Sequence, residues 1–492
     1  MDHKLGTSLH VLRLPDQLTS DDRRVIPRYF SFGQPRRIRS ICSRVAAISP
    51  ERARQRLADL EKRFNSRHRH MEHTFRENFH RVSRHVAPDQ ILSSDQEMLI
   101  GAYFTMEYSI EAAALFNPSI VPHPDQTGLE DGCVRFLMSL RATGEGHVSS
   151  VVFRHGIIDR AGRPSFDAPP RYACTASTVP DRRIDKHAYL RRLRDHGLSE
   201  ESVTAVLTQL EDNFTLSQLR AALSQLHNDG QMRVGFKRLS STMIWMAQAN
   251  YELHFPEDCQ PTEAVIFPAT PYEARGMEDV RLVRFTDPEG EVRYYGTYTA
   301  YDGWQTYPML LETADFRRFR VISLSGRYAR NKGMALFPRK VDGHYAMLAR
   351  HDGERLFLLR STDLHVWNSS QVLLTPREEW EMVQVGNCGS PIETEAGWLV
   401  LTHGVGPVRE YSIGAILLDG QNPGRVIGRL RDPLLVPTSE EREGYVPNVV
   451  YTCGSMAHAG NLVIPYAMSD SRTSFAVVPL TGLLERLLAC GP

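Results

Sequence analysis

Hydrophobic residues in the first hundred positions recur with the period of a helix. Between Ser49 and about Val82 they return at spacings of three, four and seven residues, which places them on one helix face. The residues concerned are Leu57, Leu60, Phe64, Met71, Phe75, Phe79 and Val82. The pattern therefore predicts one amphipathic helix from Ser49-Pro50 to about Val82.

Two further segments carry helix signals. The tetrapeptide Ser94-Asp95-Gln96-Glu97 has the form of a capping box and predicts a helix that continues to about Leu115. A third helical segment is predicted over about 186–228, with Ser199 beginning one part of it and Thr215 capping another. We expect this segment to be an insertion or a brace on the main domain.

The rest of the chain changes to an alternating pattern of period two, which is typical of strands. Turn dipeptides such as Asp342-Gly343 and Asp352-Gly353 separate the runs and predict antiparallel neighbours. The clearest runs are Val292 to Ala300, His344 to Ala349, Leu356 to Arg360, Trp398 to Thr402 and Ile413 to Leu418. Periodicity alone does not distinguish a sandwich, a barrel or a propeller.

Composition narrows the class of protein. The 492 residues include 58 Lys and Arg and 58 Asp and Glu, so no global field favours nucleic acid or an anionic membrane. No run of about 18 apolar residues and no signal-peptide core is evident, and we expect a soluble cytoplasmic protein. The seven cysteines are scattered singly without zinc-site spacing, which predicts reduced thiols and no metal.

One carboxylate is the first candidate for chemistry. Asp302 follows Tyr298-Thr299-Ala300-Tyr301 at the end of a predicted strand, close in sequence to the motif Gly276-Met277-Glu278-Asp279-Val280-Arg281. An acid among aromatic and cationic neighbours is what cleavage of a glycosidic bond needs as a proton donor. The alternative is that Asp302-Gly303 only forms a hairpin turn.

Several motifs in a fixed order resemble glycoside hydrolase family 130, the β-mannoside phosphorylases and their hydrolytic relatives. Besides 276–281 and 301–302 they are Asn331 to Pro338, Tyr345 to Arg350, Gly397-Trp398-Leu399 leading to His403-Gly404-Val405, and Val446 to Val450, with a weaker match at Phe116-Asn117-Pro118. The resemblance covers roughly 240–480 and implies a five-bladed β-propeller. We therefore expect a helical N-terminal extension over 1–105 and a propeller over 106–492, with a helical insertion at about 184–230.

The resemblance implies inverting phosphorolysis of a β-mannoside. Phosphate would replace the activated water, and the product would be α-mannose 1-phosphate together with a shortened acceptor. Asp302 resembles the catalytic acid of the family, which is thought to act through a sugar hydroxyl. No metal or organic cofactor is expected, and inorganic phosphate would be the co-substrate.

An incoming phosphate requires basic or hydrogen-bonding side chains. By resemblance these are Arg350 and His403, with Arg360 as a weaker third candidate. Gln384 stands where the phosphorylases usually have lysine, which leaves phosphate and water open as nucleophiles. Lys332 or Arg339 could restore that charge.

Sugar-binding residues are also implied by the resemblance. Tyr301 would stack on or position the sugar, and polar side chains would bind paired hydroxyls. These polar candidates are Asn117, Arg141, Asp279, Arg281 and Asp470. Asp279 and Arg281 could equally form a structural ion pair that links blades.

Two alternative functions stay open at this point. An inverting hydrolase on the same scaffold would need a carboxylate on the side of water attack, and Glu440, Glu441 and Glu443 are the candidates. A catalytically silent sugar-binding propeller is the other alternative. Helical extensions of this kind also favour a homo-oligomer formed through the N-terminal helices.

Overall fold

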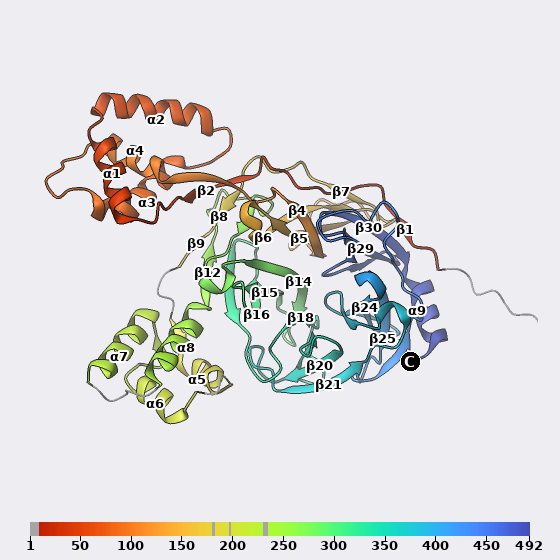
Figure 1. Cartoon of the computed structure of the whole chain (residues 1–492). Coiled ribbons are helices and arrows are strands. Elements are labelled where there is room, and N and C mark those ends of the chain that lie inside the picture. The colour runs from red at the N-terminus through yellow and green to blue at the C-terminus, as the bar shows by residue number, and fades with distance from the viewer. Residues whose placement is uncertain (1–8, 180–182, 196–197, 230–234) are drawn as a thin grey trace, which may run out of the picture.

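The structure is a computed structural model, and it describes residues 9–179, 183–195, 198–229 and 235–492. Antiparallel strands make up most of it, so the prediction of a mainly β fold is confirmed. Figure 1 shows the strands gathered into five meanders arranged around a common centre, with two groups of helices outside them. No helix within the described ranges is long and apolar enough to cross a membrane.

Each meander is a short antiparallel series of strands that follow one another in the chain. The first three comprise β4 (Ala114–Pro122), β5 (Val134–Thr143), β6 (Ser149–Ile158) and β7 (Pro164–Phe166); β14 (Gly276–Thr286), β15 (Val292–Tyr301), β16 (Thr306–Thr313) and β17 (Arg318–Ser323); and β18 (Lys332–Leu336), β19 (Tyr345–Arg350), β20 (Leu356–Ser361) and β21 (Ser369–Leu374). The fourth and fifth comprise β22 (Gln384–Asn387), β23 (Ile392–Thr394), β24 (Gly397–Val405), β25 (Tyr411–Leu418) and β26 (Val426–Arg429); and β27 (Val450–Tyr451), β28 (Met456–His458), β29 (Asn461–Met468) and β30 (Arg472–Pro479). All five predicted strand runs lie within these meanders.

Hydrogen bonding between the meanders is sparse. The first and second are joined through a single parallel pair, Ser149 with Gly276, in a sheet that also includes β8 (Cys174–Thr175), β9 (Ser177–Thr178), β12 (Tyr251–His254) and β13 (Ala264–Ile266). At the other end of the chain, β1 (Leu12–Arg13) pairs with β30, and α9 (Leu480–Cys490) follows that strand. The hydrogen-bonded sheets of the described chain do not close on themselves.

Side-chain packing joins every meander to the next one, including the fifth to the first. Consecutive residues of a strand point to opposite faces, and each face is buried against a different neighbour. The shared hydrophobic clusters contain Leu137 with Leu311, Leu310 with Met347, Leu348 with Val400, Leu401 with Ile464, and Val463 with Met138. Because both faces are buried, these strands are hydrophobic at successive positions.

The first strand of three meanders carries a bulge at the same place. The pairing register shifts between Phe116 and Ser119 in β4, between Glu278 and Arg281 in β14, and between Lys332 and Ala335 in β18. Within the bulges, φ is positive at Asn117 (50°), Asp279 (57°) and Gly333 (86°). A bulge redirects the side chains around it, and here the first two bulges bring Asn117 and Asp279 within hydrogen-bonding distance.

The N-terminal helices differ from the prediction at three points. They are α1 (Pro35–Ala46), α2 (Pro50–Phe64), α3 (Met71–Val82) and α4 (Ser94–Tyr103). The single helix expected over 49–82 is wrong because the chain leaves the helix after Phe64 and restarts at His70, which has φ of 57°. Ser93 rather than Ser94 caps α4, and the helix ends at Tyr103 rather than Leu115 because β3 (Thr105–Ser109) pairs with β2 (Val25–Tyr29).

The helices after the first meander form a separate small bundle, which Figure 1 shows beside β12. They are α5 (Lys186–Asp195), α6 (Glu200–Leu207), α7 (Leu216–Asn228) and α8 (Phe236–Gln248), with the short pair β10 (Ile184–Asp185) and β11 (Asn213–Phe214) between them. The predicted caps Ser199 and Thr215 are confirmed. Helix α8 lies beyond the predicted end of the insertion near 230.

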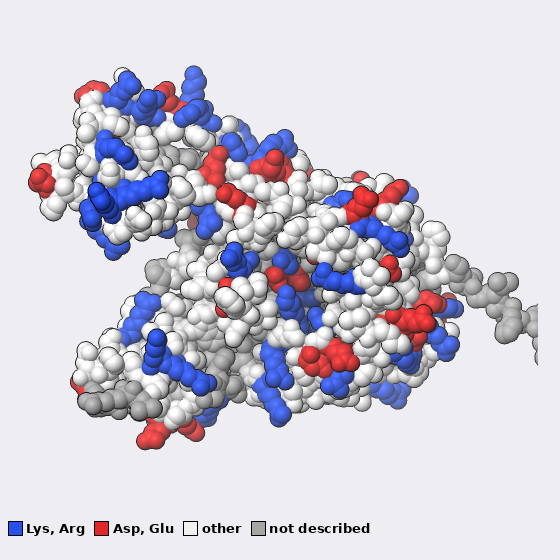
Figure 2. Space-filling view, in the orientation of Figure 1, with Lys and Arg blue, Asp and Glu red and all other residues white. Residues whose placement is uncertain are grey.

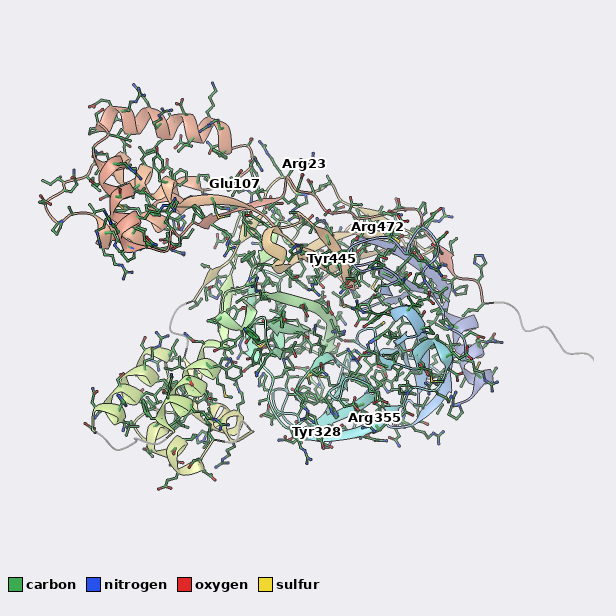
Figure 3. The ribbon with its side chains drawn as sticks, in the orientation of Figure 1. Arg23, Glu107, Tyr328, Arg355, Tyr445 and Arg472 are labelled. Carbon is green, nitrogen blue, oxygen red and sulfur yellow. The ribbon has the colours of Figure 1, made fainter. Side chains whose placement is uncertain are left out.

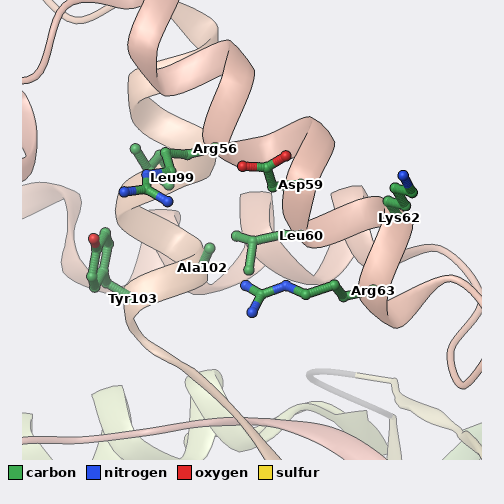
Figure 4. Close-up of a pocket in the computed structure, with 8 residues that line it drawn as sticks. All are labelled: Arg56, Asp59, Leu60, Lys62, Arg63, Leu99, Ala102 and Tyr103. Atoms are coloured by element: carbon green, nitrogen blue, oxygen red, sulfur yellow. The ribbon is translucent and has the colours of Figure 1, made fainter.

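A surface pocket lies among the N-terminal helices, between α2 and α4 (Figure 4). Its lining combines apolar side chains with three basic ones and one acidic one: Arg56, Asp59, Leu60, Lys62, Arg63, Leu99, Ala102 and Tyr103. None of the residues that the sequence analysis selected for chemistry lines this pocket. The pocket is therefore separate from the centre of the meanders.

Candidate active site

All five meanders contribute polar side chains to one network at their common centre. Figure 2 shows Lys and Arg side chains next to Asp and Glu side chains over the middle of the ring of meanders. The first three meanders supply Asn117, Arg141, Glu278, Asp279, Arg281, Lys332 and Arg350, and the last two supply Gln384, His403, Tyr451 and Asp470. Residues up to 353 positions apart in the chain thus meet in one place.

Asp279 is at the middle of this network. Its Oδ1 accepts hydrogen bonds from Asn117 Nδ2 at 2.7 Å and from Arg141 Nη1 at 3.3 Å. Burial acts to raise the pKa of Asp279, but the charges of Arg141, Arg281 and Lys332 hold that pKa below its ordinary value. The carboxylate is therefore ionised at neutral pH and can accept hydrogen bonds from a ligand.

Glu278 belongs to the same network, and the sequence analysis did not select it as a site residue although it lies in the motif 276–281. Its two oxygens bind Arg141 Nη2 at 2.9 Å and Lys332 Nζ at 2.6 Å. Lys332 is thus occupied by a carboxylate, which neutralises the charge that the sequence analysis assigned to phosphate. Together Arg141, Glu278, Asp279 and Lys332 form what we call the central ion-pair cluster.

Arg281 does not form a side-chain ion pair with Asp279. Its Nη1 donates to the backbone oxygen of Asp279 at 3.1 Å, and its Nη2 donates to the hydroxyl of Tyr451 at 2.7 Å. Arg281 is only 3% exposed, and its Nε has no hydrogen-bond partner among the described residues. A buried guanidinium so placed contributes positive charge to the centre from below the surface.

Arg350, Gln384 and His403 come together and form what we call the candidate anion site. Arg350 Nη1 donates to Gln384 Oε1 at 2.9 Å and to the backbone oxygen of Gly353 at 2.8 Å. Gln384 Nε2 lies 3.5 Å from His403 Nε2. Arg350 Nε is buried without a hydrogen-bond partner among the described residues, so this group offers an unused donor to an anion.

His403 is a neutral imidazole. Burial, together with the charges of Arg350 and Arg281, holds the pKa of His403 well below its ordinary value. Its Nδ1 lies 3.3 Å from the backbone oxygen of Asn387, which can only accept, so Nδ1 carries the proton and Nε2 is an acceptor. His403 therefore contributes hydrogen bonding rather than charge.

Asp470 faces the central ion-pair cluster from the fifth meander. Burial and the like charge of Asp279 raise the pKa of Asp470 to about 6, while Arg141 and Arg409 act in the opposite direction. Of the two carboxyl groups, Asp279 is ionised at lower pH than Asp470. This separation allows Asp470 to change its protonation state near neutral pH.

Asp302 sits in a tight turn at the end of β15. Its Oδ1 accepts the backbone N–H groups of Trp304 and Gln305, both at 2.7 Å, and its Oδ2 accepts the hydroxyl of Tyr307 at 3.1 Å. Burial acts to raise the pKa of Asp302, but these hydrogen bonds hold it below its ordinary value. The carboxyl group is therefore ionised in the free protein at neutral pH.

Aromatic rings surround this turn. Tyr307 packs against Tyr272 with ring centroids 5.4 Å apart, and Trp245 of helix α8 contacts both rings at 5.0 and 5.4 Å. The adjacent Trp304 is 92% exposed. The helical insertion thus reaches the neighbourhood of Asp302 through Trp245, a contact that the sequence pattern did not reveal.

Two predicted residues are used locally. Tyr301 donates its hydroxyl to the backbone oxygen of Gly303 at 2.9 Å. Arg360 pairs in register with Ala346, four positions along β19 from Arg350, and its Nη2 contacts Asn422 at 3.4 Å. Four residues of a strand span about 13 Å, so the structure does not bring Arg360 to the candidate anion site.

The three carboxylates considered for a hydrolase differ in their surroundings. Glu441 is buried, and it accepts hydrogen bonds from Arg13 Nε at 3.2 Å, the Tyr466 hydroxyl at 2.6 Å and the backbone N–H of Thr438 at 2.9 Å. Glu440 and Glu443 are exposed. Nearby, Tyr445 stacks on His147 with ring centroids 5.6 Å apart, and Figure 3 shows Tyr445 beside the ends of the first and fifth meanders.

Comparison with known proteins identifies the family to which the chain belongs. The sequence model described as beta-1,4-mannooligosaccharide phosphorylase matches residues 227–487. The 1,2-beta-oligomannan phosphorylase of Thermoanaerobacter sp. strain X514 is 34% identical over 219 residues, which are 43% of this chain and 71% of the relative. The beta-1,2-mannobiose phosphorylase of Listeria innocua serovar 6a is 28% identical over 263 residues, 51% of this chain and 71% of the relative.

A solved structure of the Listeria innocua beta-1,2-mannobiose phosphorylase in complex with beta-1,2-mannobiose is also similar. The aligned region covers 78% of this chain and 93% of the Listeria innocua chain, at 20% identity and a TM-score of 0.45. The sequence matches place the chain among the glycoside phosphorylases and related glycosidases, a class of carbohydrate-active enzymes. The chain belongs to glycoside hydrolase family 130.

Proposed function

We propose that this enzyme is an inverting β-mannoside phosphorylase. The observation that supports it most is the convergence of side chains from all five meanders, with a carboxylate-rich group around Asp279 and a separate group around Arg350. Three curated relatives are named for β-1,2-linked mannosides and one for β-1,4-linked mannooligosaccharides. We therefore propose a β-mannoside substrate and include both linkages in the test.

We also propose that the meanders form a five-bladed propeller over 106–492. Support comes from the five hydrophobic clusters, which join each meander to the next and the fifth to the first. The free state of all seven cysteines is consistent with a cytoplasmic location. Residues 1–105 remain the predicted helical extension, and a homo-oligomer formed through it is testable by solution molecular mass.

The proposed reaction is a single displacement at the anomeric carbon. A phosphate oxygen forms a bond to that carbon from the α face while the β-glycosidic bond breaks, so the configuration inverts. The leaving oxygen takes a proton supplied by Asp302 through a sugar hydroxyl, and the carboxylate of Asp302 later recovers a proton from solvent. The products are α-mannose 1-phosphate and a shortened acceptor.

The ionised state of Asp302 in the free protein bears on this step. A general acid must hold a proton, whereas the hydrogen bonds of the turn favour the carboxylate. A sugar bound over the turn excludes water from Asp302, and burial disfavours the charged form of a carboxyl group. Substrate binding is thus the step that raises the pKa of Asp302 and prepares the proton donor.

The anion would bind at Arg350, Gln384 and His403. Arg350 and the amide of Gln384 donate to the phosphate oxygens. Because Nε2 of His403 is an acceptor, it suits the hydroxyl of hydrogen phosphate, which donates one hydrogen bond. Asn117, Arg141, Asp279 and Asp470 would bind the mannosyl hydroxyls.

The test is the product formed from β-1,2- and β-1,4-mannobiose with and without phosphate. We expect α-mannose 1-phosphate only when phosphate is present, and kcat of Asp302→Asn lower by at least about 100-fold. The matched control is Asp315→Asn, because Asp315 also accepts two backbone N–H groups in a turn, from Arg317 and Arg318. Free mannose without phosphate would favour the hydrolase, and no product from either disaccharide would favour the silent sugar-binding propeller.

A further inference from the structure

The candidate anion site has less positive charge than a phosphate dianion requires. Gln384 is neutral, and so is His403. Of the two cations considered as substitutes, Lys332 is paired with Glu278 at 2.6 Å, and Arg339 is paired with Glu393 with an Nε to Oε2 distance of 2.9 Å. Among the described members of the candidate anion site, Arg350 is then the one cation, and the buried Arg281 adds charge only through the hydroxyl of Tyr451 and the backbone of Asp279. A second cation able to reach a bound phosphate would come from outside this group.

Arg409 lies beside the candidate anion site, on the turn between β24 and β25. Its Cζ is 5.9 Å from the ring centroid of Tyr411, within the range of a cation–π contact. The hydroxyl of Tyr411 is 3.4 Å from Gln384 Nε2, and its ring stacks on His403 with centroids 5.9 Å apart. Tyr411 therefore connects Arg409 directly to two members of the anion site.

The guanidinium of Arg409 is available for a ligand. Arg409 is exposed, and none of its guanidinium donors forms a hydrogen bond or an ion pair with another described residue. Its charge nevertheless acts on Asp470, whose pKa it lowers. Arg409 is thus close to both the proposed sugar-binding carboxylate and the anion site.

The turn that carries Arg409 has an unusual backbone conformation, which fixes the position of the Arg409 Cα. Val408 and Arg409 both have positive φ, 57° and 58°, and Val408 is a β-branched residue that is 87% exposed. Such a residue is rarely held in this conformation without a structural or functional reason. The turn between β5 and β6 has the same backbone at Gly146 (68°) and His147 (59°), so the conformation belongs to the fold rather than to the local sequence.

We infer that Arg409 is a phosphate-binding residue that supplies the positive charge missing at Gln384. This inference rests on the proposed phosphorolysis. Arg409 donates to the phosphate oxygens from the solvent side, opposite the half-buried Arg350, and Tyr411 holds its guanidinium in place. The phosphate is then bound between two guanidinium groups of two different meanders.

The first test is the KM for phosphate of Arg409→Gln at saturating β-mannobiose. Loss of a charge-assisted hydrogen bond predicts a rise of about 10- to 100-fold, with little change in the KM for the mannoside. Arg409→Lys retains the positive charge, so its KM for phosphate should rise less. The control is Arg425→Gln, because Arg425 is exposed, its side chain pairs with Asp419 at 3.4 Å, and it follows the opposite end of β25 from Arg409.

A rescue separates a charge effect from a structural one. Gln384→Lys in the Arg409→Gln background returns a cation to the anion site, and we expect it to recover most of the affinity for phosphate. Thermal shift with inorganic phosphate alone gives a readout without turnover, since a ligand that binds the folded state raises Tm. That shift should be present in the unmodified enzyme and smaller in Arg409→Gln.

The outcomes distinguish this inference from the proposed function. An unmodified enzyme that turns over mannobiose without phosphate would overturn the proposed function and this inference with it. A phosphate-dependent enzyme whose Arg409→Gln variant keeps the same KM for phosphate and the same thermal shift would overturn the role of Arg409 alone. Failure of Gln384→Lys to rescue a weakened variant would also refute it, because the defect would then not be one of charge.

Discussion

The substitution Asp470→Asn tests the electrostatics of the centre through stability. In the folded protein the pKa of Asp470 is about 6, raised from 3.8 by burial and by the like charge of Asp279. The folded state therefore binds more protons than the unfolded state between these two values. It follows that Asp470 makes the protein less stable as the pH rises through this window.

The size of the effect follows from the shift. At about 1.36 kcal/mol per pKa unit, the full loss in the free energy of unfolding is about 3 kcal/mol, of which about 1.4 kcal/mol falls between pH 5 and pH 7.5. Asparagine cannot ionise. The free energy of unfolding of the unmodified protein, minus that of Asp470→Asn, should therefore fall by about 1.4 kcal/mol over this range.

Urea denaturation at pH 5, 6 and 7.5 measures this difference. Asp419→Asn is the control, because the backbone N–H groups of Asn422 and Gln421 hold the pKa of Asp419 below its ordinary value. Asp419 is thus ionised from pH 5 to pH 7.5. The free energy of unfolding of the unmodified protein, minus that of Asp419→Asn, should therefore be constant over this range. A difference for Asp470→Asn that stays constant, or that rises toward pH 7.5, would refute the raised pKa and the proximity to Asp279 on which it depends.

Three more substitutions probe the centre. Tyr307→Phe removes a hydrogen-bond donor to the Asp302 carboxylate, so the pKa of Asp302 should rise. The basic limb of the pH profile of kcat/KM should therefore move to higher pH, and an unchanged basic limb would contradict this prediction. Lys332→Met leaves Glu278 without one of its partners, and we expect the free energy of unfolding to fall by about 1 kcal/mol because solvent screens this pair. The KM for the mannoside should rise more than the KM for phosphate. A larger rise in the KM for phosphate would instead assign Lys332 to phosphate binding. Gly386→Ala places a methyl group 2.5 Å from the imidazole of His403 and 3.1 Å from Cδ of Arg350, so the KM for phosphate should rise. The control Gly420→Ala places its methyl group 3.6 Å from the Cα of Gly397 and should leave that KM unchanged.

The middle strands of the meanders could be predicted from the sequence, and the first strands of the last three meanders could not. Strands such as β15, β19 and β24 alternate regularly and follow turn dipeptides, so local pattern identifies them. The first strands of the third, fourth and fifth meanders, β18, β22 and β27, are short, and the bulge in β18 interrupts its alternation. Local periodicity fails wherever an extra residue shifts the register.

The errors in the helical regions have a related cause. The apolar spacing of 49–82 continues across the break between α2 and α3, because residues of both helices pack into the same hydrophobic cluster. The segment after Tyr103 became a strand because β2, some eighty residues earlier in the chain, supplies its partner. A pattern restricted to neighbouring residues contains no information about such a distant partner.

The candidate site shows the same limit. Resemblance to the family selected Asn117, Arg141 and Asp279, and the structure brings these three side chains into contact. It did not select Arg409, whose position depends on a turn conformation and on the ring of Tyr411. It did select Arg360, because sequence order does not reveal which end of a hairpin faces the centre.

The pairing of β1 with β30 ties both ends of the chain into the fifth meander. Arg13, which takes part in that pairing, also binds Glu441 in the loop before β27. Removal of the segment that contains β1, or of the segment that contains β30, therefore destabilises the same meander. Proteolytic trimming at either terminus should consequently loosen the groups that surround Asp470 before it disturbs those around Asp302.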